Sequence, residues 1–266
     1  MASARAISDR ARPSSRAMLI VLVGLCIAGS AFSQKQSASP RKSKPAITKS
    51  PEIGQSAVVV DETLAVLRKA PSLFAESVHR MSRGRKVQIL GVTEADGVKF
   101  FKVTAPPANY GWVQADAVFG KFKPADEERL IRLAQAADGF EKVEISRQFF
   151  DLYPNSRFKP ALLLVYGDVI EDLAVRLSRD ASSRLSRTEM AAGGAPMHSY
   201  YLNFNMLDRY RKLGVVFLFN PATKQFHYDG ESWKEIVAKF TAAPESAEAQ
   251  KRLTSLQQKL AKSVSK

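Results

Sequence analysis

Residues 87–114 read VQILGVTEADGVKFFKVTAPPANYGWVQ, and this stretch decides the fold of the first half of the chain. It contains three β-rich runs, at Val87–Val92, Lys99–Thr104 and Tyr110–Gln114. The turn signals Ala95-Asp96-Gly97 and Pro106-Pro107-Ala108-Asn109 separate these runs. Because apolar and polar residues alternate with a period of two, the stretch predicts antiparallel strands joined by short turns.

The same pattern extends towards the N-terminus. Two further β-rich runs lie at Ala57–Val60 and Leu64–Leu67, and turn signals follow at Lys69–Ser72 and Ser82–Arg85. Short strands at this spacing favour a small closed sheet over an open one. The sequence therefore predicts a small β-barrel over residues 57–120.

Four segments of this region resemble the bacterial SH3-like domain: Leu64–Ser72 (LAVLRKAPS), Gly84–Leu90 (GRKVQIL), Phe101–Val103 (FKV) and Gly111–Val113 (GWV). Two positions depart from the family pattern. Lys69-Ala70 stands where the family has Ser-Gly before a proline, and Phe100 or Phe101 stands at the central tryptophan. The resemblance implies an SH3-like barrel that contacts a cell-wall peptide or another peptide.

Five residues of the barrel are candidate ligand contacts. Phe101, Tyr110 and Trp112 could line a groove, with Arg68 and Asn109 as its polar groups. The alternative is that Phe101 and Trp112 fill the core of the small barrel.

From about Pro124 the apolar period changes to 3.6, which predicts helices. One is expected at Ala125–Ala137, and a second carries the stripe Phe140, Val143, Phe150 and Tyr153. A third carries a stripe from Leu162 to Leu177, with Ser156 as its N-cap and Pro160 in its first turn.

Further helices are expected at Leu202–Leu213, at Ser232–Phe240 and along a final apolar stripe that ends at Leu260. Between them, residues 215–229 read as an inserted β-hairpin, because two β-rich runs flank the turn Asn220–Thr223. The sequence thus predicts a multidomain chain, all-β and then mainly α, whose helical domain spans 125–262.

Phe149–Ser156 followed by the helix Ala161–Asp168 resembles the tetratricopeptide-like repeats of periplasmic accessory and outer-membrane assembly proteins. Lys239–Ala249 repeats the same order of helix, proline, serine and helix. The resemblance implies a helical domain that holds a protein partner. Tyr200, Tyr201 and Trp233 are the candidate contacts, and core packing is the alternative for all three.

The N-terminus has the features of an export signal. Four arginines precede the apolar run Met18–Ile27, and the small residues of Ala31-Phe32-Ser33 follow it. We expect a signal peptide at 1–33, cleaved after Ser33, and a disordered basic linker at 34–56. An uncleaved membrane anchor is the alternative. Cleavage would remove Cys26, the only cysteine, and would leave a protein of the periplasm or cell envelope.

The charge distribution bears on the class of partner. The chain carries a net charge of +14, of which +8 lies in residues 1–50. A nucleic-acid-binding protein would carry its basic patch on a folded domain, so we expect no nucleic-acid partner. The linker could contact an anionic membrane surface.

No catalytic, metal-binding or cofactor-binding motif is present. The histidines His79, His198 and His227 do not form a metal-ligand pair, and His227 is expected on the hairpin surface. The acid pairs Glu127-Glu128 and Glu171-Asp172 are expected to face solvent.

The sequence therefore predicts a non-enzymatic, exported binding or scaffold protein of the cell envelope, with no cofactor. Its expected partners are a cell-wall peptide or an envelope protein. A pure protein-interaction adaptor with a degenerate barrel is one alternative, and a cell-wall hydrolase with an SH3-like targeting domain is another.

Overall fold

The structure, a computed structural model, describes residues 50–105, 109–185 and 187–261. The signal peptide expected at 1–33 and residues 34–49 of the expected linker lie outside the described residues. Within the described ranges, no helix combines the length and the apolar character needed to cross a membrane.

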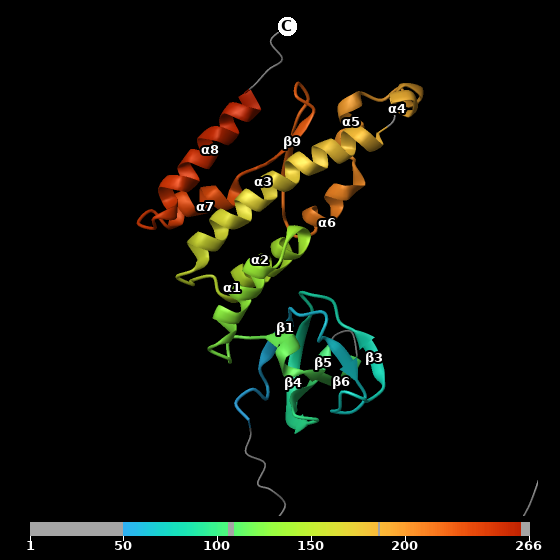
Figure 1. Cartoon of the computed structure of the whole chain (residues 1–266), viewed down its shortest axis with the longest axis vertical. Helices are drawn as coiled ribbons and strands as arrows, with labels where there is room; N and C mark the ends of the chain where they lie inside the picture. The colour runs from blue at the N-terminus through green and yellow to red at the C-terminus, as the bar shows by residue number, and fades with distance from the viewer. Residues whose placement is uncertain (1–49, 106–108, 186, 262–266) are drawn as a thin grey trace, which may run out of the picture. The chain divides into compact units, whose positions relative to one another are not determined.

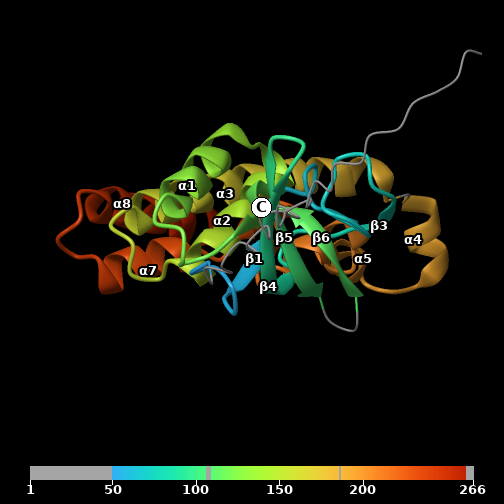
Figure 2. The same ribbon diagram turned by 90° about the horizontal axis from the view of Figure 1, so that it is seen from below.

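An antiparallel sheet of seven strands forms the first part of the described chain (Figure 1). Its strands are β1 (Ser56–Val59), β2 (Val66–Arg68), β3 (Ser77–Arg80), β4 (Lys86–Ala95), β5 (Val98–Ala105), β6 (Asn109–Gln114) and β7 (Val118–Phe119). Their order in the sheet is β3-β2-β6-β5-β4-β1-β7, and a 3₁₀ turn, η1 (Ala115–Ala117), precedes β7. Figure 2 shows β4, β5 and β6 side by side in this sheet.

The five expected strands correspond to β1, β2, β4, β5 and β6, so the alternating pattern located them correctly. The edge strand β3 was not predicted, because three of its four side chains are exposed and it has no buried face to set a period. The strand β7 was not predicted either, because it is only two residues long.

The core of the sheet follows the alternation of the strands. Val87 and Ile89 of β4, Phe101 and Val103 of β5, and Val113 of β6 are all buried in one cluster. The register between β4 and β5 shifts between Ile89 and Gly91. A bulge of this kind bends a strand, which allows the sheet to curl around its apolar side.

The last residues of the expected linker, from Ser50 on, are among the described residues and contact the sheet. Residues 51–54 form a turn, and the Glu52 carboxylate lies 2.5 Å from Lys99 Nζ on β5. Hydrogen bonds from Lys99 and Ser50 lower the pKa of Glu52 to about 2. Glu52 is the first acid after a run of basic residues, and its pairing with Lys99 attaches this segment to the sheet.

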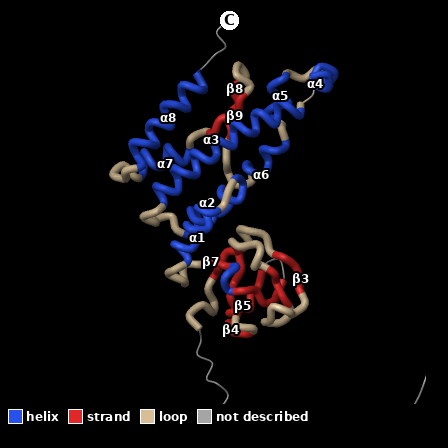
Figure 3. The backbone as a smooth tube through the Cα atoms, in the orientation of Figure 1, coloured by secondary structure: helices blue, strands red, loops and turns tan. Residues whose placement is uncertain are grey.

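Helices and short turns form the rest of the described chain, together with one hairpin (Figure 3). The α-helices are α1 (Asp126–Ala136), α2 (Gly139–Leu152), α3 (Lys159–Arg184), α4 (Arg187–Gly193), α5 (Met197–Leu202), α6 (Asp208–Arg211), α7 (Glu231–Lys239) and α8 (Glu245–Ala261). The change of apolar period near Pro124 therefore marked the change from strands to helices correctly.

Two local predictions for the helices are wrong. The N-cap of α3 is Phe158 and not Ser156, whose hydroxyl instead accepts a hydrogen bond from the Phe158 amide at 3.1 Å. Residues 202–213 are not one helix, because α5 ends at Leu202 and a 3₁₀ turn, η2 (Asn205–Leu207), precedes α6. The buried residues Phe204, Leu207 and Tyr210 recur every three positions, which suits 3₁₀ winding better than a continuous α-helix.

The expected hairpin is present as β8 (Phe217–Asn220) and β9 (Gln225–Tyr228), paired antiparallel. It lies beside α3, as Figure 3 shows, and the two elements contact each other along β9. Phe226 of β9 is fully buried, and Tyr201 of α5 packs against its neighbour Phe219 with ring centroids 5.1 Å apart. The hairpin therefore closes the helical core and is not an exposed insertion.

The sheet and the first helices share an apolar cluster of their own. Val60 and Phe119, at the ends of β1 and β7, pack with Leu130 of α1 and with Phe149 of α2. The Arg83 guanidinium adds ion pairs to Glu141 and Glu144 of α2, at 2.6 and 2.8 Å. The described residues accordingly belong to a single compact unit.

Candidate functional site

The predicted ligand residues of the sheet do not all lie on one surface. Arg68 of β2 pairs with Trp112 of β6, and Tyr110 lies on the same face of β6 as Trp112, two residues away. Tyr110 is 63% exposed, Trp112 is half-buried, and Asn109 is half-buried at the start of β6. On β5, Lys102 lies opposite Trp112.

Phe101 points to the other side of the sheet. Its side chain is fully buried, and its ring packs edge-on against Phe122 with centroids 6.2 Å apart. The groove that included Phe101 is therefore corrected to an outer face that contains Tyr110, Trp112 and Lys102. For Phe101, the core alternative was the right one, because successive residues of a strand face opposite sides of the sheet.

Gly111 explains how Arg68 and Trp112 come to be neighbours. A Cβ atom at Gly111 would lie 2.7 Å from the Arg68 carbonyl oxygen and 2.7 Å from Leu67 Cγ, so only glycine permits this approach of β2 to β6. The Arg68 guanidinium donates to the Ala75 carbonyl at 2.8 Å and so holds the loop between β2 and β3. Arg68 acts here as a loop anchor, and its Nη1 is already engaged.

The three aromatic candidates of the helical part do not form a common groove. Tyr201 and Trp233 are buried, at 5% and 2% exposure, and Trp233 packs edge-on against Tyr228. The Tyr200 hydroxyl donates to the Met190 carbonyl at 3.1 Å. Core packing, the alternative reading, describes Tyr201 and Trp233, and Tyr200 fastens α5 to α4.

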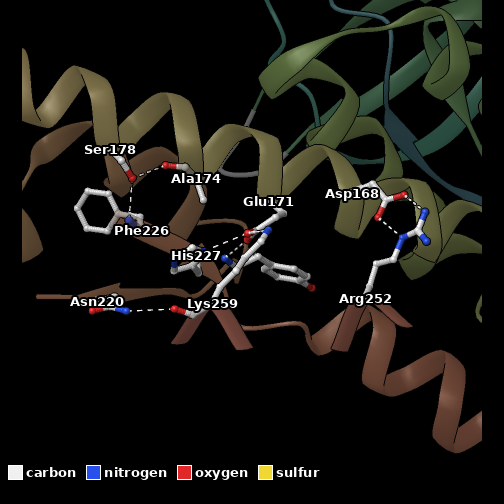
Figure 4. A network of polar contacts seen from close by, with 10 residues as sticks. Asp168, Glu171, Ala174, Ser178, Asn220, Phe226, His227, Arg252 and Lys259 are labelled. Atoms are coloured by element: carbon white, nitrogen blue, oxygen red, sulfur yellow. Dashed lines mark hydrogen bonds and ion pairs between the residues drawn. The ribbon is translucent and has the colours of Figure 1, made fainter. Parts of the chain in front are cut away.

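A network of polar contacts was not predicted, and it joins α3, β9 and α8 (Figure 4). At its centre is Glu171 of α3, whose side chain is 11% exposed. Its Oε1 lies 3.1 Å from His227 Nδ1 and accepts from Lys259 Nζ at 2.7 Å, and its Oε2 accepts from the Tyr228 amide at 2.9 Å. Burial raises the pKa of Glu171, but the three hydrogen bonds outweigh burial and lower the pKa to about 2.

Four more contacts, made by Arg252 and Ser178, extend this network. Arg252 of α8 lies 3.3 Å from Asp168 of α3, and it also donates to Glu248 at 2.6 Å. On the other side, the Ser178 hydroxyl donates to the Ala174 carbonyl and accepts from the Phe226 amide, each at 2.7 Å. Together these bonds attach the hairpin and the C-terminal helix to α3.

Two predictions are corrected by this network. Glu171 does not face solvent with its neighbour Asp172, and His227 is not on the hairpin surface, since it is only 2% exposed. The pattern Gln225-Phe226-His227-Tyr228 indicates one buried and one exposed face for a strand. Here three successive residues of β9, Phe226, His227 and Tyr228, are buried where the strand contacts α3, and the carboxylate of Glu171 compensates for the burial of His227.

The contact between Glu171 and His227 has the geometry by which a carboxylate orients a general base. The other ring nitrogen, Nε2, would then be the reactive atom. It is buried and has no hydrogen-bond partner among the described residues. Within the described residues, the contact of His227 with Glu171 joins β9 to α3.

A cavity of about 350 Å³ lies beside the network, between α3, α7 and α8. Both cations in its lining are already paired, Arg252 with Asp168 and Lys259 with Glu171. In the part of the chain that the structure describes, no group of three or more His, Cys, Asp or Glu residues could hold a metal ion.

Gly167 sets the distance between α3 and α7. A Cβ atom there would lie 2.6 Å from Ser232 Oγ and would also clash with the indole nitrogen of Trp233. We expect Gly167→Ala to lower the free energy of unfolding by about 2 kcal/mol, because overpacking must displace the buried indole. Urea unfolding followed by fluorescence measures this change.

Gly91→Ala is the matched control for Gly167→Ala. Its Cβ would have only an ordinary contact of 3.5 Å with Lys102, so its expected effect is below about 0.5 kcal/mol. Equal effects of the two substitutions would contradict the close approach of α3 and α7.

No protein-family model, no curated protein and no solved structure matches this chain significantly.

Proposed function

We propose that this chain is a non-enzymatic, exported binding or scaffold protein of the cell envelope. In this proposal the sheet is an SH3-like barrel that contacts a peptidoglycan peptide or another peptide. The helical part, tetratricopeptide-like, holds a protein partner. The observation that carries the proposal is the outer face of β6, where the exposed Tyr110 stands beside Trp112 with Lys102 opposite.

The strand order supports the SH3-like assignment. In that fold the first strand lies between the second and the last, and a 3₁₀ turn precedes the last strand. Here β1 lies between β4 and β7, the order continues through β5 to β6, and η1 precedes β7. In this comparison β2 and β3 belong to the long loop after the first strand.

The helix pairs support the tetratricopeptide-like assignment. The helices α1 and α2 contact each other, and so do α7 and α8. A proline follows α2 at Pro154, and another precedes α8 at Pro244. Two such pairs separated by the hairpin would give a scaffold with few repeats.

The outer face of β6 has the chemistry of a peptide site. Aromatic side chains supply a large, rigid contact area at low entropic cost, and their polar atoms retain hydrogen-bonding capacity. Lys102 adds a positive charge suited to a carboxylate of the ligand. The burial of His227 Nε2 supports the non-enzymatic part of the proposal. Zymography on peptidoglycan tests this part, and a cleared zone would contradict it.

Binding to purified sacculi tests the proposed wall contact. We expect Tyr110→Ala to weaken binding about tenfold, as the loss of one aromatic contact usually does, without unfolding the protein. Trp112→Ala should have at least the same effect. The measurement is the amount of protein that co-sediments with sacculi over a range of protein concentrations.

Phe74→Ala is the control, because Phe74 is 88% exposed but lies in the loop between β2 and β3. An equal loss with Phe74→Ala would indicate unspecific apolar adhesion. If the wild-type protein stays in the supernatant, the wall contact is refuted.

A pure protein-interaction adaptor is the second candidate. It is favoured by the engagement of Arg68 with the Ala75 carbonyl, which leaves the barrel with fewer free polar groups than the family pattern implies. Crosslinking in cells distinguishes the two candidates, since an adaptor gives discrete protein partners and no muropeptide.

A further inference from the structure

A second cavity lies between the C-terminal half of α3 and the turn of the hairpin, with a volume of about 710 Å³. Arg179, Ser182 and Ser183 line it from α3, and Thr223, Lys224 and Gln225 line it from the hairpin. No carboxylate is among its lining residues. The lining therefore offers two cations, four hydroxyl groups and an amide, with no opposing acid.

The walls of this cavity are fixed by internal hydrogen bonds. At its floor, the buried Ser178 hydroxyl accepts from the Phe226 amide at 2.7 Å and so sets the distance between α3 and β9. The Asn220 carboxamide oxygen accepts from the Ala222 amide at 3.0 Å and shapes the turn that carries Lys224. A site with fixed walls loses little conformational entropy when a ligand binds.

The two cations of the cavity have no ion-pair partner among the described residues, whereas Arg252 and Lys259 in the cavity beside α8 are both paired. A cation in the last turn of a helix is stabilised by the helix dipole, which accounts for Arg184 at the end of α3. That effect does not extend to Arg179, more than one turn before the helix end, or to Lys224, which is not on a helix.

We propose that this cavity binds a phosphate group carried as a monoester or diester on a larger molecule. The planar guanidinium of Arg179 can donate two parallel hydrogen bonds to phosphate oxygens, and Lys224 adds a second positive charge. The Thr223 hydroxyl and the Ser182 hydroxyl, which lies 3.4 Å from the Tyr201 hydroxyl, can donate to the remaining oxygens. The Ser183 hydroxyl already donates to the Asp180 carbonyl at 3.0 Å. The proposal is independent of the peptide ligand proposed for the β6 face.

Two probes test the full chain, and they separate the sources of the phosphate. Glycerol phosphate, measured by calorimetric titration, represents a free ester, and vesicles of phosphatidylglycerol, measured by co-sedimentation, represent a lipid headgroup. We expect the double variant Arg179→Gln/Lys224→Gln to weaken binding to the effective probe about tenfold or more, because charge-assisted hydrogen bonds are lost.

The double variant Arg157→Gln/Lys212→Gln is the matched control. It removes one exposed arginine and one exposed lysine that do not line the cavity, so the net charge changes equally. The basic segment before residue 50 is the same in all three proteins and contributes equally to vesicle binding. We expect the control to retain binding within about twofold.

Binding of both probes, or of vesicles alone, supports the proposal when only the Arg179/Lys224 double variant loses it. The first result assigns the site to phosphate esters in general, and the second assigns it to a lipid headgroup. An equal loss in both double variants would show an effect of net charge alone and would overturn the proposal. So would the absence of binding to either probe.

Discussion

Replacement of Glu171 by alanine is expected to lower the free energy of unfolding by about 3 kcal/mol, because breaking a buried ion pair leaves its partners buried and unpaired. The substitution leaves the Tyr228 amide and His227 Nδ1 without an acceptor in the core. Lys259 loses its ion-pair partner, but its side chain is 42% exposed and can turn to solvent. The unpaired groups on β9 therefore account for most of the expected loss.

Asp172→Asn is the control for this change. Asp172 is the next residue on α3, it is exposed, and it has no ion pair among the described residues. Its replacement should alter the free energy of unfolding by less than about 0.5 kcal/mol. The free energy of unfolding is measured by urea unfolding in a Trp112→Phe background, where the fluorescence of Trp233 reports on the part of the core that contains Glu171. Equal effects at positions 171 and 172 would contradict the network.

The pH dependence of stability gives an independent test of Glu171. Its pKa is about 2 in the folded protein and about 4.5 when the chain is unfolded. A carboxyl group with a depressed folded-state pKa contributes stability above its unfolded pKa, and this contribution is lost as the pH falls through the folded pKa. The wild type should therefore lose stability from about pH 4.5 towards pH 2, and Glu171→Gln should show a flatter profile in that window.

The contrast between Glu171 and Asp172 shows what the sequence could not predict. On a helix, adjacent side chains point about 100° apart, so one of these two carboxylates can face a neighbouring element while the other faces solvent. Which face is covered depends on α8, whose contacts with α3 join residues 88 positions apart. Local pattern carries no information on such a pairing. The exposure predicted for His227 failed for the same reason.

The positions of the strands were predicted correctly because each of these strands buries one face against a single core. The alternation in β4, β5 and β6 is produced by the same burial that forms the sheet, so the strands were located from the sequence. The outer-face residues Tyr110 and Trp112 follow from that alternation as well. The same rule placed Phe101 and Phe100 on opposite sides, yet the groove hypothesis assigned Phe101 to the face of Trp112. The groove hypothesis grouped aromatic side chains without applying the alternation, and this was the source of the error.

A second large effect is expected for Arg83→Ala, at the junction of the sheet with α2. The Arg83 side chain is only 8% exposed. Its guanidinium binds Glu141 and Glu144, and its Nε donates to the Val60 carbonyl at 2.8 Å. Removing a buried arginine that satisfies two carboxylates and a carbonyl should cost about 3 kcal/mol. Burial already raises the pKa of Glu144, and without Arg83 this pKa should rise further.

The two tryptophans allow the junction to be measured from both sides, since Trp112 lies in β6 and Trp233 in α7. In single-tryptophan variants of otherwise wild-type protein, both probes should report one common unfolding transition, as expected for a single compact unit. In Arg83→Ala the transition should move to lower urea concentration, and the two probes should separate, because α2 loses its ion pairs with Arg83.

Arg132→Ala and Arg83→Lys complete the test. Arg132 makes a surface ion pair with Glu128 at 3.8 Å, and its removal should cost less than about 0.5 kcal/mol. Lysine at position 83 keeps the charge but lacks the planar guanidinium, which donates to two carboxylates and a carbonyl at once. It should therefore restore only part of the stability. Full restoration by lysine would mean that charge alone holds the sheet to α2. Coincident transitions in Arg83→Ala would mean that the apolar cluster around Phe119 and Phe149 suffices to couple them.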